Sequence, residues 1–256
     1  MQKRTILGVC LLSVGFALAL CVGAQAQAAK GKPAVYTYVA EWDVPRAQWG
    51  EMTKLDEDDR AVLDKLMADG TIINYGAYTN LIHQEGQPTH GSWFTATSEG
   101  NLLKALEVIY AHPGSVSAPV QGASKHWDQI LTGDVYNGKP GNSTGYLTWS
   151  RWVVKPGEMH AFNEVTKTMF VPVLDKLVAD GTITSYGMLT EDYHQEKLGT
   201  VYQYFTVPDA ASLDKVNKAF EDAFGNNPTI SDAFRALTER DGHQDFLTRL
   251  RFMVSK

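Results

Sequence analysis

The feature that most constrains the fold of this 256-residue chain is an internal repeat. When the sequence is shifted by 111 residues, 62–95 lies over 173–206 without a gap, and 19 of the 34 residues are identical. With a single-residue offset the match extends to 36–42, which aligns with 146–152. Two copies are too few for a solenoid, which needs about three repeats to bury its faces. The repeat therefore predicts two similar units that share an interface.

Each copy contains the same order of predicted elements. Strands are expected where β-branched and aromatic residues gather, and helices where apolar residues recur at four-residue spacing. An Asp-Gly pair should end the first helix of each copy, and Pro172 should kink or divide that helix in the second copy. The first copy is predicted as strand 35–44, helix 46–68, strands 71–80 and 90–97, helical region 98–126 and strand 129–136. The second is predicted as strand 146–154, helix 157–179, strands 182–191 and 201–207, helical region 209–240 and strand 245–254.

This β-α-β-β-α-β order is a split βαβ unit, in which helices cover one face of an antiparallel sheet. The other face stays bare unless the two copies place their bare faces together. The sequence thus predicts an α+β fold in which two ferredoxin-like repeats, 29–137 and 145–256, pack sheet to sheet as a barrel within one chain. The segment 138–144, rich in Gly, Asn, Ser and Pro, is expected to be a linker between the half-barrels.

The repeated residues resemble a known family. Trp152-Val-Val-Lys-Pro-Gly157, followed by Leu174-Asp-Lys-Leu177 and Asp180-Gly-Thr-Ile-Thr-Ser-Tyr-Gly187, is similar to the dimeric α/β-barrel superfamily. That group includes antibiotic-biosynthesis-type monooxygenases, stress-responsive barrel proteins and NIPSNAP-like domains. The resemblance covers nearly all of 34–256 and implies one half-barrel per copy, in a barrel that the family usually forms between two chains. It implies no particular reaction, because this superfamily hosts unrelated chemistries and plain binders.

The first 28 residues have the pattern of a secretory signal peptide. A basic start precedes the apolar stretch 5–22, and two Ala-x-Ala sites allow cleavage after Ala26 or Ala28. We expect a mature protein in the periplasm or the medium, with no membrane association after cleavage. One alternative is an uncleaved anchor, since about 18 apolar residues is near the lower limit for spanning a bilayer. A second alternative is a lipoprotein attached at Cys21.

Composition excludes several functional classes. Both cysteines, Cys10 and Cys21, precede the expected cleavage sites, so the mature chain can form no disulfide and no Cys-ligated metal site. The remaining chain has 21 basic and 29 acidic residues, a net charge of −8. Nucleic acid is therefore not expected as a partner, because phosphate binding depends on Lys and Arg. We expect a monomer or a homodimer.

The tripeptide His83-Gln-Glu85 recurs as His194-Gln-Glu196, although the three residues before it differ completely. In an extended chain, His and Glu two positions apart point to the same side. The two pairs could hold a divalent metal ion with nitrogen and oxygen ligands, or His83 and His194 could act in acid–base catalysis. They could equally make structural hydrogen bonds at the ends of two hairpins.

Two charged residues occupy equivalent positions in apolar strands. Glu41 lies in Val39-Ala-Glu-Trp42, and Arg151 lies in Trp149-Ser-Arg-Trp152. If the strand face opposite the helices lines the barrel, the two side chains could meet in its interior. Buried charges are costly unless they are paired, so this pair is interpreted either as a structural ion pair or as a substrate-recognition pair.

Aromatic residues are expected to line the barrel. In the third strand of each copy, Phe94 and Phe205 are assigned to the helix-packed face, which leaves the alternate residues for the interior. Such a lining suits a pocket for a flat organic ligand, and it suits a filled core between the halves as well. The predicted pocket residues are Tyr75, Trp93, Trp149, Tyr186 and Tyr204. The other residues assigned to the interior are Thr95, Tyr202 and Thr206.

No nucleotide-binding, metalloprotease or serine-hydrolase motif is present. Haem is not expected, because none of the candidate iron ligands has a supporting motif. Those candidates are His112, His126, His160 and His243. No cofactor is predicted, and a divalent ion at the two H-Q-E segments is the one exception that the pattern allows.

These patterns predict an exported protein that binds an aromatic or hydrophobic small molecule between the half-barrels. The chemistry that they allow is cofactor-independent oxygenase or acid–base activity at His83, His194, Glu41 and Arg151. The alternative is a non-catalytic periplasmic binding or stress-associated module. A cavity lined by the named residues would favour the first interpretation, and a filled core the second.

Overall fold

The protein is described by a computed structural model that covers residues 32–225 and 228–256. The predicted signal peptide, its cleavage sites and both cysteines lie outside the described residues. Within the described ranges, no helix is both long and apolar enough to span a membrane.

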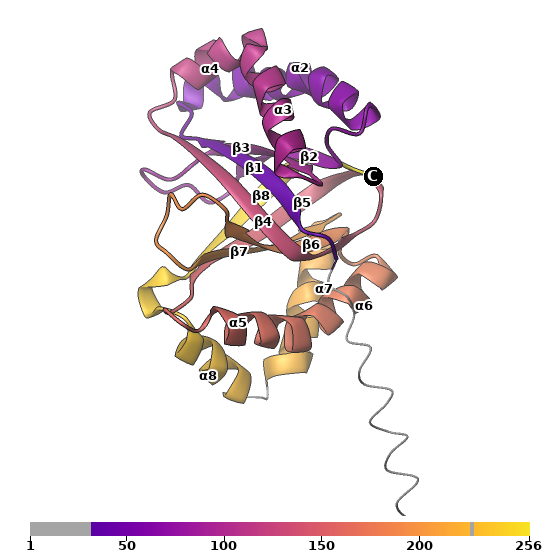
Figure 1. Ribbon diagram of the computed structural model, residues 1–256, viewed down its shortest axis with the longest axis vertical. Coiled ribbons are helices and arrows are strands. Elements are labelled where there is room, and N and C mark those ends of the chain that lie inside the picture. The colour runs from indigo at the N-terminus through magenta and orange to yellow at the C-terminus, as the bar shows by residue number, and fades with distance from the viewer. Residues whose placement is uncertain (1–31, 226–227) are drawn as a thin grey trace, which may run out of the picture. The chain divides into compact units, whose positions relative to one another are not determined.

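The described strands close into one antiparallel barrel (Figure 1). They are β1 (Val35–Trp42), β2 (Asn74–Asn80), β3 (His90–Ala96), β4 (His126–Gly138), β5 (Gly141–Val153), β6 (Ser185–Glu191), β7 (Thr200–Val207) and β8 (Gln244–Ser255). Around the barrel the order is β1-β3-β2-β8-β5-β7-β6-β4, with β4 paired back to β1. Each half contributes four neighbouring strands, and the halves join where β8 pairs with β2 and β4 pairs with β6. The predicted intrachain α/β barrel is confirmed, and closure leaves no sheet edge unpaired.

The helices of the described residues lie on the outside of the barrel, with those of each half on opposite sides in Figure 1. The first half has α2 (Trp49–Ala68), α3 (Glu99–Ala111) and α4 (Ala118–Gln121), together with short 3₁₀ turns at Arg46–Gln48 and Pro113–Val116. The second half has α5 (Met159–Val165), α6 (Val171–Asp180), α7 (Ala210–Phe220) and α8 (Pro228–Leu237), with a 3₁₀ turn at Arg240–Gly242. Two π-helical turns, Thr166–Phe170 and Glu221–Gly225, connect α5 to α6 and follow α7.

The helices cover the barrel because outward-facing apolar residues of the strands pack against them. In the first half Phe94 and Ala96 of β3 pack with Leu102 of α3 in one buried cluster. In the second half Val201 and Val207 of β7 pack with Phe162 of α5 in another. The repeat thus builds two outer cores, one for each half, and leaves the inner faces of the strands to form the site.

The predicted helix ends are confirmed. Gly70 and Gly181, which follow α2 and α6, have φ values of 82° and 83°, the left-handed conformation that glycine adopts without a Cβ penalty. The helix that contains Pro172 is divided as expected: a π-helical turn ends at Phe170, and Pro172 sits in the first turn of α6, where its missing N–H is not needed.

The predicted linker 138–144 is different in the structure. Strand β4 continues to Gly138 and β5 begins at Gly141, so that only Lys139 and Pro140 connect them. Gly138 pairs with Ser185 of the other half, and Gly141 pairs with Ser255 at the end of β8. These pairings extend both strands into the Gly-rich segment, and the β4 pairing is made with the other half. Residues Pro33–Lys256 accordingly form one compact unit.

Candidate functional site

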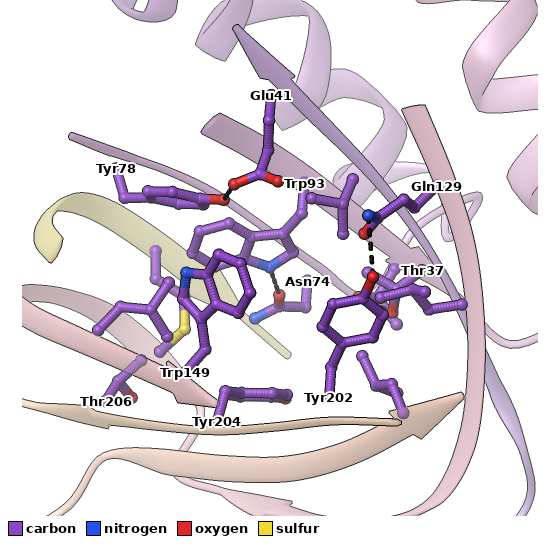
Figure 2. A pocket seen from close by; sticks show the side chains of 16 residues that line it. Thr37, Glu41, Asn74, Tyr78, Trp93, Gln129, Trp149, Tyr202, Tyr204 and Thr206 are labelled. Atoms are coloured by element: carbon purple, nitrogen blue, oxygen red, sulfur yellow. Dashed lines mark hydrogen bonds between the residues drawn. The ribbon is translucent and has the colours of Figure 1, made fainter. Parts of the chain in front are cut away.

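Alternate residues of each strand face the barrel interior, as the two-residue period of a strand requires. They enclose a cavity of about 90 Å³, to which all eight strands contribute (Figure 2). This volume is several times what one water molecule needs. The apolar part of the lining is formed by Val39, Leu131, Leu147, Leu189 and Met253. The polar part includes Thr37, Asn74, Thr95 and Thr206.

Two aromatic rings inside the barrel each lie over a glycine of the neighbouring strand, where the missing side chain leaves room for the ring. A Cβ at Gly76 would lie 2.4 Å from the Trp93 ring, and a Cβ at Gly187 would lie 2.6 Å from the Tyr204 ring. Gly76 and Gly187 are equivalent in the repeat, as are Trp93 and Tyr204. Each half therefore places an aromatic ring over the equivalent glycine, which narrows the interior without filling it.

Glu41 of β1 is the acidic residue that lines this cavity (Figure 2). Its side chain is buried, with a residue exposure of 6%, and Oε1 accepts a 2.5 Å hydrogen bond from the Tyr78 hydroxyl. Burial raises the pKa of Glu41 to about 7, although the Tyr78 hydrogen bond and the nearby Arg151 both lower it. The carboxyl can therefore gain or lose a proton near neutral pH, as a general acid or base must.

A second cavity, of about 220 Å³, adjoins the first at the rim of the barrel. The two share Glu41, Gln129, Trp149 and Tyr202. The rim cavity adds 86–88 from the β2–β3 connection, and also Trp127, Arg151, Glu196 and Phe246. Glu41 thus lies where the rim meets the apolar interior.

Arg151 lies beside Glu41 but pairs with other groups. Its Nη1 is 3.4 Å from Glu196 Oε2, and its Nη2 donates a 3.2 Å hydrogen bond to Gln244 Oε1. Glu41 and Arg151 therefore both line the rim cavity, with no ion pair between them among the described contacts, whereas the sequence suggested a meeting in the barrel interior. The closest partner of Glu41 is Tyr78 instead.

The two H-Q-E segments do not form a metal site. His83, Glu85 and His194 are exposed, and the His83 ring lies 4.9 Å from the Trp49 ring with Nε2 2.6 Å from the Asn80 carbonyl oxygen. In the described part of the chain, no group of three or more His, Cys, Asp and Glu side chains could hold a metal ion. The divalent-metal prediction is wrong because both tripeptides lie in irregular loops after β2 and β6, where the same-side rule for extended chain does not apply.

Three of the five predicted pocket aromatics line the interior: Trp93, Trp149 and Tyr204. The other two face the helices. The Tyr75 hydroxyl donates to Asp64 of α2, and the Tyr186 hydroxyl donates to Asp175 of α6. Their placement in the pocket was wrong, because in β2 and β6 the residues on either side point inward. The remaining interior assignments, Thr95, Tyr202 and Thr206, are confirmed by the cavity lining.

Sequence reasoning missed Tyr78 and Gln129. Tyr78 reaches Glu41 by crossing Gly91, where a Cβ would lie 2.3 Å from the ring. Gln129 Nε2 donates a 3.0 Å hydrogen bond to the Tyr202 hydroxyl. The available signal for Tyr78 was its position two residues after Gly76, on the same face of β2.

The sequence matches no family model and no curated protein. Solved structures share the fold over most of the chain. A candidate monooxygenase from Lactobacillus acidophilus is 11% identical, with a TM-score of 0.64, covering 87% of this chain and 96% of that one. A candidate monooxygenase from Fusobacterium nucleatum is 12% identical, with a TM-score of 0.61, covering 88% and 95%. An anthrone oxidase-like protein is 10% identical, with a TM-score of 0.55, covering 88% and 94%. The chain therefore has the dimeric α/β-barrel fold.

The expectation that excluded haem needs correction. A chlorite dismutase from Candidatus Nitrospira defluvii, 10% identical with a TM-score of 0.52, covers 87% of this chain and 91% of its own, and chlorite dismutases are haem proteins. The fold itself is thus compatible with haem, and the weakness of a sequence motif was not a sound reason to exclude it.

A haem iron requires an axial ligand, which in many haem proteins is a histidine or a cysteine. A third cavity, of about 160 Å³, lies between the sheet and the helices of the second half, lined by Trp152, Phe170 and Met188 among others. None of the three cavities described has a histidine in its lining. One ring nitrogen each of His112, His126 and His243 lies 3.0 Å from an aspartate oxygen, and His160 is exposed. Because no histidine faces any of these cavities, their linings do not fit a haem that needs an axial histidine.

Proposed function

We propose that this protein, which has the dimeric α/β-barrel fold, binds a small apolar or aromatic molecule inside the barrel and that Glu41 acts on it as a general acid or base. The observation that carries the proposal is a buried carboxyl group at the junction of the rim and interior cavities, with its pKa raised to about 7. A cavity with this lining favours the ligand-binding interpretation over a scaffold with a filled core.

The proposed step is a proton transfer. When Glu41 is ionised, it takes a proton from the ligand: the ligand's C–H or O–H bond breaks and an O–H bond forms on the carboxylate. Tyr78 holds the carboxyl group in place through its hydrogen bond to Oε1. Arg151 lies on the same cavity wall, where its positive charge stabilises the anion left on the ligand.

The structural neighbours support an extension of this step. Two of them are named as candidate monooxygenases and one as anthrone oxidase-like. In the proposed extension the deprotonated ligand supplies electrons to dioxygen, which is the oxidant and a second substrate. Removing the proton is the part of such a reaction that Glu41 would perform.

The test uses 5-nitrobenzisoxazole, a flat neutral molecule. A base that removes its ring C–H proton breaks the N–O bond and yields a coloured nitrile phenolate. We expect the rate to rise with pH through about 7, as Glu41 ionises, and to fall by about 100-fold in Glu41→Gln, within the usual contribution of a general base. Absorbance of the product measures both.

Glu51→Gln is the matched control, because Glu51 is an exposed carboxylate on α2. Its rate should equal that of the wild type. A wild-type rate no higher than that of Glu41→Gln would contradict the acid–base role. Equal loss of activity in both variants would contradict the assignment to Glu41.

Export is part of the proposal. The basic start, the apolar stretch 5–22 and the Ala-x-Ala sites support a mature chain that begins at Gln27 or Ala29. The intact mass of the protein recovered from the periplasm or the medium should match one of these starts. A retained Met1 would contradict cleavage, and an added lipid mass on a chain that begins at Cys21 would indicate a lipoprotein.

A further inference from the structure

Glu196 is the one residue of the two H-Q-E segments that lines any of the three cavities described. Its carboxylate faces Arg151, with Oε2 3.4 Å from Nη1. Both side chains are about one third exposed, at 31% for Arg151 and 34% for Glu196. The pair therefore sits at the rim, on the solvent side of the buried Glu41.

Other contacts fix the positions of this pair. The Glu196 backbone N–H donates a 3.1 Å hydrogen bond to Oε2 of the buried Glu191, which anchors the loop after β6. The far side of the Arg151 guanidinium donates to Gln244 on β8. Arg151 is thus held between Glu196 and Gln244, and its Nε atom is buried without a hydrogen-bond partner.

We infer that Glu196 is a positioning residue: it holds the Arg151 guanidinium at the rim and prevents it from forming an ion pair with Glu41. The inference rests on the proposed role of Glu41, because a permanent ion pair would keep that carboxyl ionised and leave it a weak base at neutral pH. By holding Arg151 at the rim, Glu196 allows Glu41 to gain and lose a proton near neutral pH, although Glu196 does not contact Glu41.

The charges around Glu41 are consistent with this arrangement. The titratable and charged groups that face it are Tyr78 of β2, Arg151 of β5, Glu196 of the loop after β6 and Tyr202 of β7. Glu191 of β6 interacts with Tyr202 and is not among the groups that act on Glu41. The β3 and β4 residues of the two cavity linings carry no charge. Arg151 is the one cation among these groups, so its position decides whether Glu41 has a counter-charge.

The first copy of the repeat offers a natural comparison. Its equivalent of Arg151 is Glu41, and its equivalent of Glu196 is the exposed Glu85. A carboxylate at Glu85 has no guanidinium to hold at the equivalent position. The repeated H-Q-E tripeptide is therefore used differently in the two halves, and only the second copy acts on the site.

The experiment follows the carboxyl ¹³C resonance of Glu41 against pH in the ligand-free protein. The resonance is assigned by its disappearance in Glu41→Gln. In Glu196→Gln, we expect the pKa of Glu41 to fall by about 1–2 units, because Arg151 can then approach and a nearby negative charge is removed. Glu85→Gln, the matched variant of the other copy, should leave this pKa unchanged.

Repeating the measurement in a protein that carries Arg151→Gln distinguishes the positioning role of Glu196 from the simple loss of its negative charge. In Arg151→Gln, the further change Glu196→Gln should lower the pKa of Glu41 much less than it does in the wild type. An equal fall in both backgrounds, or no fall in Glu196→Gln alone, would overturn the positioning role and leave the proposed function intact. A wild-type Glu41 that titrates near 4.5 would overturn both proposals.

Discussion

Gly76→Ala should lower the free energy of unfolding by about 2–3 kcal/mol, near the upper end of what overpacking a core costs. The new Cβ would lie 2.4 Å from the Trp93 ring and 2.7 Å from the backbone carbonyl oxygen of Phe252. The ring cannot simply turn away, because Trp93 Nε1 donates a hydrogen bond to Asn74. This carbonyl belongs to β8, which pairs with β2 where the two halves join, so the new contact strains the strand pairing that closes the barrel. Urea denaturation at equilibrium measures the change.

Two further alanine variants calibrate this result. For Gly187→Ala the three nearest atoms all belong to the Tyr204 side chain, the first at 2.6 Å, and no backbone atom is among them, so a smaller loss is expected. Gly100→Ala, on α3, meets nothing within 4 Å and should stabilise the protein by about 0.5–1 kcal/mol through helix propensity. Equal stability of the Gly76→Ala and Gly100→Ala proteins would refute the close packing of Trp93 against β2.

Glu41→Gln should stabilise the protein relative to the wild type, and the difference should grow as the pH rises. Burial raises the pKa of Glu41 from 4.5 in the unfolded chain to about 7 in the folded one. Between these values the unfolded chain releases the proton and the folded protein retains it, so wild-type stability falls with rising pH. This displacement corresponds to about 3 kcal/mol, complete above pH 7. Glutamine cannot ionise and avoids this loss.

The measurement is the difference in unfolding free energy between the two proteins from pH 4 to pH 8. Other titrating groups, such as Asp56, contribute to both proteins and cancel in the difference. A difference that stays constant across this range would mean that Glu41 has the same pKa, near 4.5, in the folded protein and in the unfolded chain. The site would then lack a base that exchanges protons near neutrality.

The site could be predicted in part, because the two-residue strand period acts locally. Assigning Phe94 to the helix face placed Trp93 and Thr95 in the interior, and the cavity lining bears this out. The same reasoning failed for Tyr75, since the outer face of β2, which carries Tyr75 and Ala77, was not recognised from the sequence. It failed for His83 and His194 because extended geometry was assumed where the chain forms irregular loops.

Tyr78 shows why the remainder of the site was out of reach. Its hydroxyl meets Glu41 across β3, and the ring passes over Gly91 only because β2, β3 and β1 are neighbours in the barrel. The strand period separates Tyr78 from the outward-facing Tyr75, but nothing in the local sequence shows that Tyr78 meets Glu41. Strand order, which depends on packing between distant segments, decides which side chains share a cavity.

The sequence by itself determined the duplicated β-α-β-β-α-β order, the helix ends at Gly70 and Gly181, and the division of one helix near Pro172. These features depend on local conformational preference and on the periodicity of apolar residues. Only the tertiary structure decided that β4 and β8 each pair with the other half, and that Arg151 pairs with Glu196 while Glu41 pairs with Tyr78. Strand pairing and charge pairing between distant segments depend on which backbone edges and side chains the closed barrel brings together, and a local pattern carries no record of that geometry.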